Sequence, residues 1–180
     1  MTLHDYLPGL HGWHVLALGS ATGMVLHTTF VASVIQFKSL PRQTFGLLQS
    51  KQFPIYFGLC AGLGLFLTYS TYRLSHFPEP KGFLDTISKN IATSTAKSHD
   101  AWNVGFMAAA TTGAFANLLV VGPATRKVKQ LREQFEKTGA EVPKDISKRF
   151  GRLHGISSLL NLVMVGAVVA NCLWVGNKWS

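Results

Sequence analysis

The distribution of charged residues constrains the fold of this chain more than any other feature. The chain has 17 Lys and Arg and eight Asp and Glu, and none of them lies in four long windows. A transmembrane helix needs about 20 mostly apolar residues to cross about 30 Å of hydrocarbon, and each window is long enough. The charge-free windows are residues 6–37, 52–72, 101–125 and 153–177.

A soluble four-helix bundle is the alternative, but its helices would carry a polar stripe at helical spacing. Residues 59–67 and 163–170 are instead apolar on all sides, which favours lipid as the surroundings. We therefore predict an all-α, multi-pass integral membrane protein, with residues 1–180 forming a single transmembrane domain. The four transmembrane helices are expected at about residues 13–37, 53–73, 101–121 and 153–175.

The N-terminus does not resemble a cleavable signal peptide. Residues 1–12 contain no Lys or Arg, and the apolar run that follows is longer than the core of a signal peptide. We expect the first span to be retained.

Basic residues are concentrated in two connections, which four spans would place on the same side of the membrane. The first connection, at 38–52, carries Lys38, Arg42 and Lys51. Because Lys and Arg in short loops favour the cytoplasmic side, we predict a cytoplasmic basic hairpin at 38–52 and a cytoplasmic amphipathic loop at 122–152. This longer loop carries Arg126, Lys127, Lys129, Arg132, Lys137, Lys144, Lys148, Arg149 and Arg152.

Tryptophan positions agree with this orientation. Trp13, Trp102, Trp174 and Trp179 all fall at the ends of the spans opposite to the basic loops. Trp favours the membrane–water interface, where an apolar ring keeps one polar edge in water. The four Trp residues therefore predict one common boundary.

The first connection contains residues that favour a turn. Pro41 cannot continue a helix, and Gly46 relaxes the backbone. We expect Ser50 to cap the second membrane helix and Pro54 to lie in its first turn. A tight interfacial hairpin is the interpretation that we favour, and a loop that contacts a ligand is the alternative.

Helical spacing is also visible in the other two connections. In residues 73–100, Leu84, Ile87 and Ile91 predict a short surface helix. Residues 122–152 predict two amphipathic helix extensions joined at 138–144, with Gly139 as a helix stop. We expect a basic patch on this loop to contact anionic lipid headgroups. The patch consists of Arg126, Lys127, Lys129, Arg132, Lys148, Arg149 and Arg152.

Three polar residues within the spans are predicted to lie near one depth. His27 is 11 residues from Lys38, whereas Asn117 and Asn161 are each nine residues from the nearest basic residue of the loops. Polar groups in hydrocarbon must find partners, so we predict a polar layer of His27, Asn117 and Asn161 inside the bundle. Its role is either interhelical hydrogen bonding, at about 0.6 kcal/mol per contact, or a proton or substrate site.

Small residues recur at spacings that allow helices to approach closely. Gly19 and Gly23 in the first span, and Gly58 and Gly62 in the second, are each four residues apart. Such spacing indicates helix packing, either within the chain or between copies of it. Similar stripes comprise Ala101, Gly105, Ala109 and Gly113 in the third span and Gly166 and Ala170 in the fourth.

The sequence carries no recognisable catalytic or metal-binding motif. Cys60 and Cys172 are expected about 16 Å apart in depth, which is too far for a disulfide. The seven His residues are scattered, and neither a metal nor a cofactor is predicted. Nucleic-acid binding is not expected, although the net charge is +9, because membrane topology already explains the basic residues.

Two segments resemble the transmembrane protein 205-like family, which is also described as a domain of unknown function. The first runs from Phe30 to Phe57 and contains Phe37-Lys38-Ser39-Leu40-Pro41-Arg42-x-Thr44-Phe45-Gly46. The second is His154-Gly155-x-Ser157-Ser158-Leu159-x-Asn161. The resemblance covers about residues 13–175. It implies a four-span eukaryotic membrane protein of the endomembranes or plasma membrane, and it supplies no activity, cofactor or catalytic residue.

The resemblance also implies that the two segments form one structural motif at the cytoplasmic boundary. We hypothesise that Arg42, Gln49, Ser50, His154 and Ser157 meet there and join the second and fourth spans. The boundary motif comprises Pro41, Arg42, Gly46, Gln49, Ser50, Lys51, Pro54, His154, Gly155 and Ser157.

These observations predict a non-enzymatic membrane protein that acts as a membrane organiser or an accessory subunit. The alternative is a small transporter or channel component that uses the central polar layer. The expected partners are the lipid bilayer and either a second copy of the chain or another membrane protein. A dry, fully packed bundle would favour the organiser, and a polar path would favour the transporter.

Overall fold

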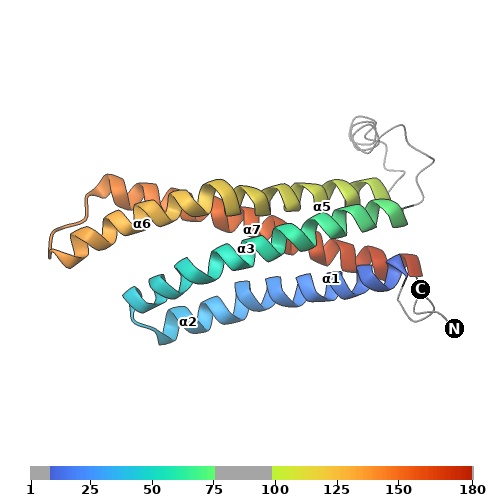
Figure 1. Cartoon of the computed structure of the whole chain (residues 1–180), viewed down its shortest axis with the longest axis horizontal. Coiled ribbons are helices and arrows are strands. Elements are labelled where there is room, and N and C mark those ends of the chain that lie inside the picture. Colours follow the sequence, from blue (N-terminus) through green and yellow to red (C-terminus); the bar gives the residue numbers. More distant parts are fainter. Residues whose placement is uncertain (1–8, 76–98, 180) are drawn as a thin grey trace.

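A computed structural model describes residues 9–75 and 99–179 of the chain. Figure 1 shows these residues as long antiparallel helices that form a bundle, which confirms the predicted all-α fold. The α2–α3 and α6–α7 turns lie at one end of the bundle, and the start of α1 and the end of α7 lie at the other, which we call the terminal end (Figure 1). The surface helix predicted at Leu84, Ile87 and Ile91 falls outside the described residues.

Four continuous helical segments of the described chain are long and apolar enough to cross a membrane. The second is the single helix α3, and the fourth lies within the single helix α7; the first and third each contain a short π-helical stretch. The elements are α1 (Leu10–Leu26), η2 (His27–Ala32), α2 (Ser33–Ser39), α3 (Arg42–Leu74), α5 (His99–Ala116), η3 (Asn117–Val121), α6 (Gly122–Lys137) and α7 (Lys144–Trp179).

The π-helical stretch η3 has an identifiable cause. Pro123 lies two residues beyond it and has no N–H to donate to the carbonyl four residues earlier. The backbone N–H of Gly122 instead donates to the carbonyl of Asn117, five residues earlier. The wider turn lets the third segment continue past the proline without a break. It also changes the direction in which Asn117 and the residues of α6 point.

The first connection is shorter than the sequence predicts. Only Leu40 and Pro41 separate α2 from α3, and Pro41 is the N-cap of α3. The prediction that Ser50 caps the second membrane helix is wrong, because α3 already starts at Arg42 and continues through Pro54. Ser50 lies inside the helix and donates a 2.7 Å hydrogen bond to the Leu47 carbonyl.

Gly46 has a different role from the predicted one. It lies within α3, not in a turn, and the Lys129 ammonium of α6 donates a hydrogen bond to its carbonyl. A Cβ at this position would lie 2.7 Å from the Lys129 side chain. Gly46 is therefore a point of close approach between α3 and α6.

The second turn follows the prediction. Helix α6 ends at Lys137 and α7 begins at Lys144. Gly139 adopts a left-handed conformation with φ of 69°, which glycine reaches without a steric penalty. The two helix extensions therefore join at the predicted residues.

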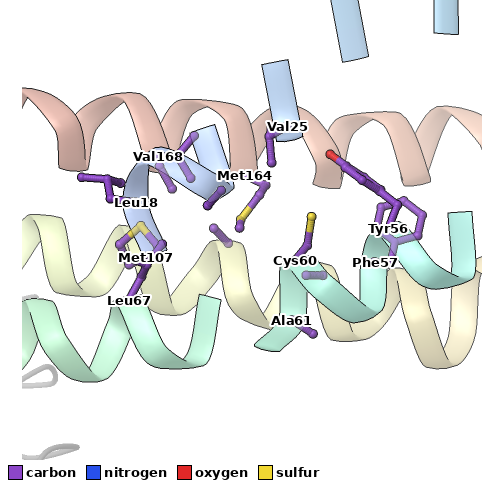
Figure 2. Close-up of a cluster of buried hydrophobic side chains, with 14 residues drawn as sticks. Leu18, Val25, Tyr56, Phe57, Cys60, Ala61, Leu67, Met107, Met164 and Val168 are labelled. Atoms are coloured by element: carbon purple, nitrogen blue, oxygen red, sulfur yellow. The ribbon is translucent and has the colours of Figure 1, made fainter. Parts of the chain in front are cut away.

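A core of buried apolar side chains fills the bundle. Figure 2 shows Tyr56 and Phe57 at one end of this core, with the Tyr56 hydroxyl directed toward α7. Cys60 is buried and Cys172 half-buried, and both are free thiols as predicted. The fully buried members include Val25, Cys60, Leu67, Met107, Met164 and Val168.

Close packing occurs at Gly64 of α3, Gly113 of α5 and Gly166 of α7, but not at the glycine pairs predicted in the first and second spans. A Cβ on Gly64 would lie 2.6 Å from the Thr111 hydroxyl oxygen, and one on Gly166 would lie 3.1 Å from the Phe106 ring. Packing within the chain is the wrong interpretation for four predicted glycines, because a Cβ there would meet nothing within 4 Å. These glycines are Gly19, Gly23, Gly58 and Gly62.

The tryptophans differ in their surroundings. Trp13 and Trp102 are 45% and 60% exposed at the terminal end of the bundle, as expected for residues at an interface. Trp174 is buried, and its Nε1 donates a 2.6 Å hydrogen bond to Asp100. Trp174 therefore joins α7 to α5 and does not face the membrane boundary.

Candidate functional site

A cavity of about 740 Å³ lies at the end of the bundle that holds the two helix turns. It is bounded by η2 and α2, by the first half of α3, by η3 and α6, and by the first half of α7. The α2–α3 and α6–α7 hairpins diverge at this end (Figure 1). Its volume is in the range of sites for small ligands, about 300–1,000 Å³.

The walls of the cavity are mostly apolar, and five phenylalanine residues contribute to them. Phe37 and Phe45 pack edge to face at 5.6 Å, and Phe53 stacks on Phe57 at 5.7 Å. On the opposite wall, the Arg132 guanidinium lies 4.9 Å from the centre of the Phe150 ring. Such walls suit an acyl chain or another apolar group.

A hydrogen-bonded group closes the inner end of the cavity. The Tyr56 hydroxyl donates a 2.6 Å bond to Asn161 Oδ1, and Asn161 Nδ2 donates a 2.8 Å bond to the Thr29 hydroxyl. A residual void beyond Asn117 and Asn161 is too small for a water molecule. The cavity therefore ends at this polar layer.

Asn117 has an unused hydrogen-bonding group at the same depth. Its side chain is 1% exposed, and its Nδ2 donates a 3.2 Å bond to the Ser157 carbonyl. Its Oδ1 has no partner in the part of the chain that the structure describes. Because a buried acceptor without a donor costs free energy, Asn117 Oδ1 is an unsatisfied group on a residue that lines the cavity.

The mouth of the cavity carries four basic and two acidic side chains. Glu136 pairs with Arg42 at 3.5 Å and with Arg132 at 3.8 Å, and Glu133 pairs with Lys129 at 3.3 Å. Arg126 also lines the cavity. Within residues 9–75 and 99–179, it forms none of the ion pairs and hydrogen bonds seen for the other three. The mouth therefore has an excess of positive charge.

The structure brings together two of the three residues predicted for the polar layer. Asn117 and Asn161 both line the cavity. The prediction that His27 points into the bundle is wrong, because its side chain is exposed on the outer surface of the first segment. Thr28 and Thr29, the next two residues, face the cavity instead. His27 shares the outward face of this segment with Gly19 and Gly23, whereas the prediction placed that face inside the bundle.

The boundary motif lies largely around the cavity. Arg42, Gln49, Ser50, His154 and Ser157 all line it, but no hydrogen bond joins any two of them in the described chain. They form opposite walls and do not staple the second and fourth segments. Of the remaining motif residues, Gly46 and Pro54 line the cavity, whereas Pro41, Lys51 and Gly155 are exposed outside it.

The predicted basic patch is divided between two surroundings. Arg126, Lys129 and Arg132 line the cavity. The other four are exposed at the same end of the bundle: Lys127, Lys148, Arg149 and Arg152.

A second polar cluster, which the sequence analysis did not identify, lies near the opposite end. His14 is fully buried; its Nδ1 lies 2.7 Å from the Ser70 hydroxyl and its Nε2 lies 2.9 Å from Asn171 Oδ1. Asn171 Nδ2 donates a 2.8 Å bond to the Thr71 hydroxyl. This cluster joins α1, α3 and α7 within a packed part of the bundle.

Comparison with known proteins identifies the family. A family model described as a domain of unknown function, DUF4149, matches residues 16–134. The chain belongs to this family. It is also similar to transmembrane protein 205 from Danio rerio, with 27% identity over 175 residues that cover 90% of this chain and 89% of the relative. No solved structure matches the chain.

Membership agrees with the structure on two points. The chain is a multi-pass integral membrane protein, as its four apolar helices and its transmembrane relative indicate. Neither the family description nor the relative's name indicates an enzymatic activity. The family match includes the cavity residues of η2, α3 and η3 and those of α6 up to Glu133, and it ends before α7.

Proposed function

We propose that this protein is a non-enzymatic component of membrane transport and that it binds a small amphipathic molecule in the cavity between its two hairpins. The observation that carries this proposal is the cavity itself, which has apolar walls between a polar inner layer and a charged mouth. A molecule with an apolar body and polar groups at separate positions is complementary to these surroundings.

The cavity also supports transport over the role of a membrane organiser. An organiser needs only a packed bundle and outward-facing contacts, whereas this bundle contains a cavity of about 740 Å³ between its two hairpins. Beyond the polar layer, the helices close around Leu67, Met107 and Met164. The protein therefore offers access from one end, and passage across the membrane would require a second conformation or a second subunit.

The proposal is tested by filling the cavity with a side chain. Ser157→Phe places a ring among the residues that line the cavity, whereas Leu159→Phe changes a position that is 63% exposed on the outside of α7. Purified full-length protein is incubated with fatty acids and lysophospholipids in mild detergent, and bound molecules are counted by native mass spectrometry. Wild type and Leu159→Phe should retain a bound molecule, and Ser157→Phe should lose it.

The outcome that overturns the proposal is also defined. If none of the added amphiphiles remains bound to wild type, or if Ser157→Phe and Leu159→Phe bind equally, the cavity is not a binding site. A circular dichroism spectrum and a thermal unfolding curve show whether Ser157→Phe is folded. Should it be unfolded, Ser33→Leu, which projects into the cavity from α2, replaces it.

One observation favours a second candidate, an organiser that acts by self-association. Gly19 and Gly23 are open on the outer face of α1, and His27 is exposed in the same segment. A polar imidazole facing hydrocarbon is costly unless it is paired, and glycines four residues apart allow close helix contact. A second copy of the chain, packed through this face, would supply the partner.

Cysteine cross-linking tests this second candidate. A Ser20→Cys variant in native membranes should give cross-linked dimers, and the further substitution Gly23→Ile should abolish them. Dimers that Gly23→Ile does not affect, or the absence of dimers, would contradict this candidate.

The exposed basic residues at the same end are expected to contact anionic headgroups. Lys127 and Lys148 are exposed close to the cavity mouth, and each basic residue near an anionic membrane surface contributes about 1 kcal/mol. This contact would place the mouth of the cavity at the headgroup level.

A further inference from the structure

We infer that the occupant of the cavity is a single-chain anionic amphiphile with a hydroxyl group on its chain, held by Arg126 at the anionic end and by Asn117 Oδ1 at the hydroxyl. This inference rests on the proposed function and specifies the ligand of the same site.

Charge balance at the mouth indicates the anionic end. Glu136 and Glu133 already pair with Arg42, Arg132 and Lys129. Arg126 lines the cavity and shares in none of these pairs. A guanidinium forms strong charge-assisted hydrogen bonds with carboxylate or phosphate groups. An anionic group on the ligand would supply the missing partner.

The second recognition point is the unpartnered acceptor of Asn117. The donation from Nδ2 to the Ser157 carbonyl fixes the orientation of the amide, because a carbonyl cannot donate a hydrogen bond to an amide oxygen. Oδ1 is thereby left as a buried acceptor without a partner in the described chain, on a residue that lines the cavity. Only a donor satisfies it, and a hydroxyl is the smallest donor that an otherwise apolar chain carries.

The two recognition points also define the size of the ligand. Asn117 and Arg126 are nine residues apart along η3 and α6, which corresponds to about 13 Å at 1.5 Å per residue. A cavity of about 740 Å³ holds one small ligand, which favours one acyl chain over two. The hydroxyl group therefore lies part-way along the acyl chain of the ligand, well separated from its anionic group.

The test uses three probes that differ by one group each: 12-hydroxystearate, stearate and methyl 12-hydroxystearate. Their dissociation constants are measured on full-length protein in nanodiscs of phosphatidylcholine by displacement of a fluorescent fatty acid. Wild type should bind 12-hydroxystearate about fivefold more tightly than stearate, because of one hydrogen bond. It should bind 12-hydroxystearate about 30-fold more tightly than the methyl ester, because of one charge-assisted contact.

Variants assign each preference to a residue. Asn117→Leu should bind 12-hydroxystearate and stearate equally, and Arg126→Gln should bind 12-hydroxystearate and its methyl ester equally. Lys127→Gln is the matched control, since it removes the same charge from the exposed neighbouring position, and it should retain both preferences. Asn117→Leu also removes the bond to Ser157, so Asn117→Ser provides a second variant if the first fails to fold.

The failure of this inference differs from the failure of the proposed function. If all three probes bind with equal affinity and Ser157→Phe prevents their binding, the cavity binds amphiphiles but does not recognise these two groups. If the hydroxyl alone has no effect, water satisfies Asn117 and the inference is wrong. If no probe binds wild type, the proposed function also fails.

Discussion

The Tyr56 hydroxyl on α3 donates a 2.6 Å hydrogen bond to Oδ1 of Asn161 on α7. The same amide donates a 2.8 Å bond to Thr29 on η2, so Asn161 joins three helical segments at the inner end of the cavity. These contacts connect the two hairpins at the depth where they begin to diverge. The position of the polar layer therefore limits how far the cavity extends into the bundle.

Removal of the Tyr56 hydroxyl should lower stability by a small but measurable amount. Tyr56→Phe loses one buried hydrogen bond, which contributes about 0.5–1.5 kcal/mol and about 0.6 kcal/mol on average in a membrane bundle. Asn161→Leu should cost more than Tyr56→Phe, because it leaves both the Tyr56 and the Thr29 hydroxyls without their partner. The free energy of unfolding is measured in micelles by denaturant titration.

The control for this prediction is Tyr69→Phe. Tyr69 is 51% exposed and accepts a surface hydrogen bond from Arg73. Its replacement should change the free energy of unfolding by less than about 0.5 kcal/mol. Equal effects of Tyr56→Phe and Tyr69→Phe would contradict a structural role for the polar layer.

Two histidines in the first segment should differ strongly in their effect on stability. His14→Leu leaves Asn171 Oδ1 buried without its imidazole donor, which costs about 1–3 kcal/mol. His27→Leu changes an exposed side chain, and the free energy of unfolding of the monomer should change by less than about 0.5 kcal/mol. Chemical denaturation of monomeric protein in detergent measures both. A larger loss for His27→Leu than for His14→Leu would show that the buried cluster is misplaced.

The sequence predicted the membrane fold because the bilayer imposes a simple rule on it. Charge is excluded from the spans, and windows such as 52–72 and 101–125 show this without knowledge of any contact. The turn at Gly139 was predictable for a similar reason, because a left-handed residue has a local chemical preference. The depth of Asn117 and Asn161 followed from counting residues along regular helices.

It was harder to predict which side chains face the interior of the bundle. His27 was expected inside as part of the polar layer, but it lies on the outer face of the first segment together with Gly19 and Gly23. The cavity was also not predictable, since it arises from the divergence of two hairpins and not from a local pattern. Arg126 lines the cavity, whereas its neighbour Lys127 is exposed. A count of basic residues along the sequence cannot show this difference.

Glycine substitutions on α3 should separate a packed position from an open one. Gly64→Ala would place a Cβ 2.6 Å from the Thr111 hydroxyl oxygen and would disturb the 3.1 Å bond between Thr68 and Thr111. Overpacking of this kind costs about 1–3 kcal/mol. Gly62→Ala meets nothing within 4 Å, and it should leave the free energy of unfolding unchanged or raise it by up to about 1 kcal/mol, because alanine favours the helix. Equal loss at both positions in thermal unfolding assays would contradict the packing of α3 against α5.

The end of the bundle that contains the cavity mouth is expected to face the cytoplasm, because the basic residues of the first and last turns favour that side. Single cysteines test this orientation in a background with Cys60→Ala and Cys172→Ala, since both native thiols are free. Position 148 lies at the mouth end and position 13 lies at the terminal end, and both are exposed. The two variants are Lys148→Cys and Trp13→Cys.

For protein at the cell surface, a membrane-impermeant maleimide should label Trp13→Cys in intact cells. It should label Lys148→Cys only after permeabilisation. For protein in internal membranes, selective permeabilisation of the plasma membrane should expose Lys148→Cys alone. The reverse pattern in either experiment would place the mouth of the cavity on the non-cytoplasmic side, and amphiphiles would then have to enter from there.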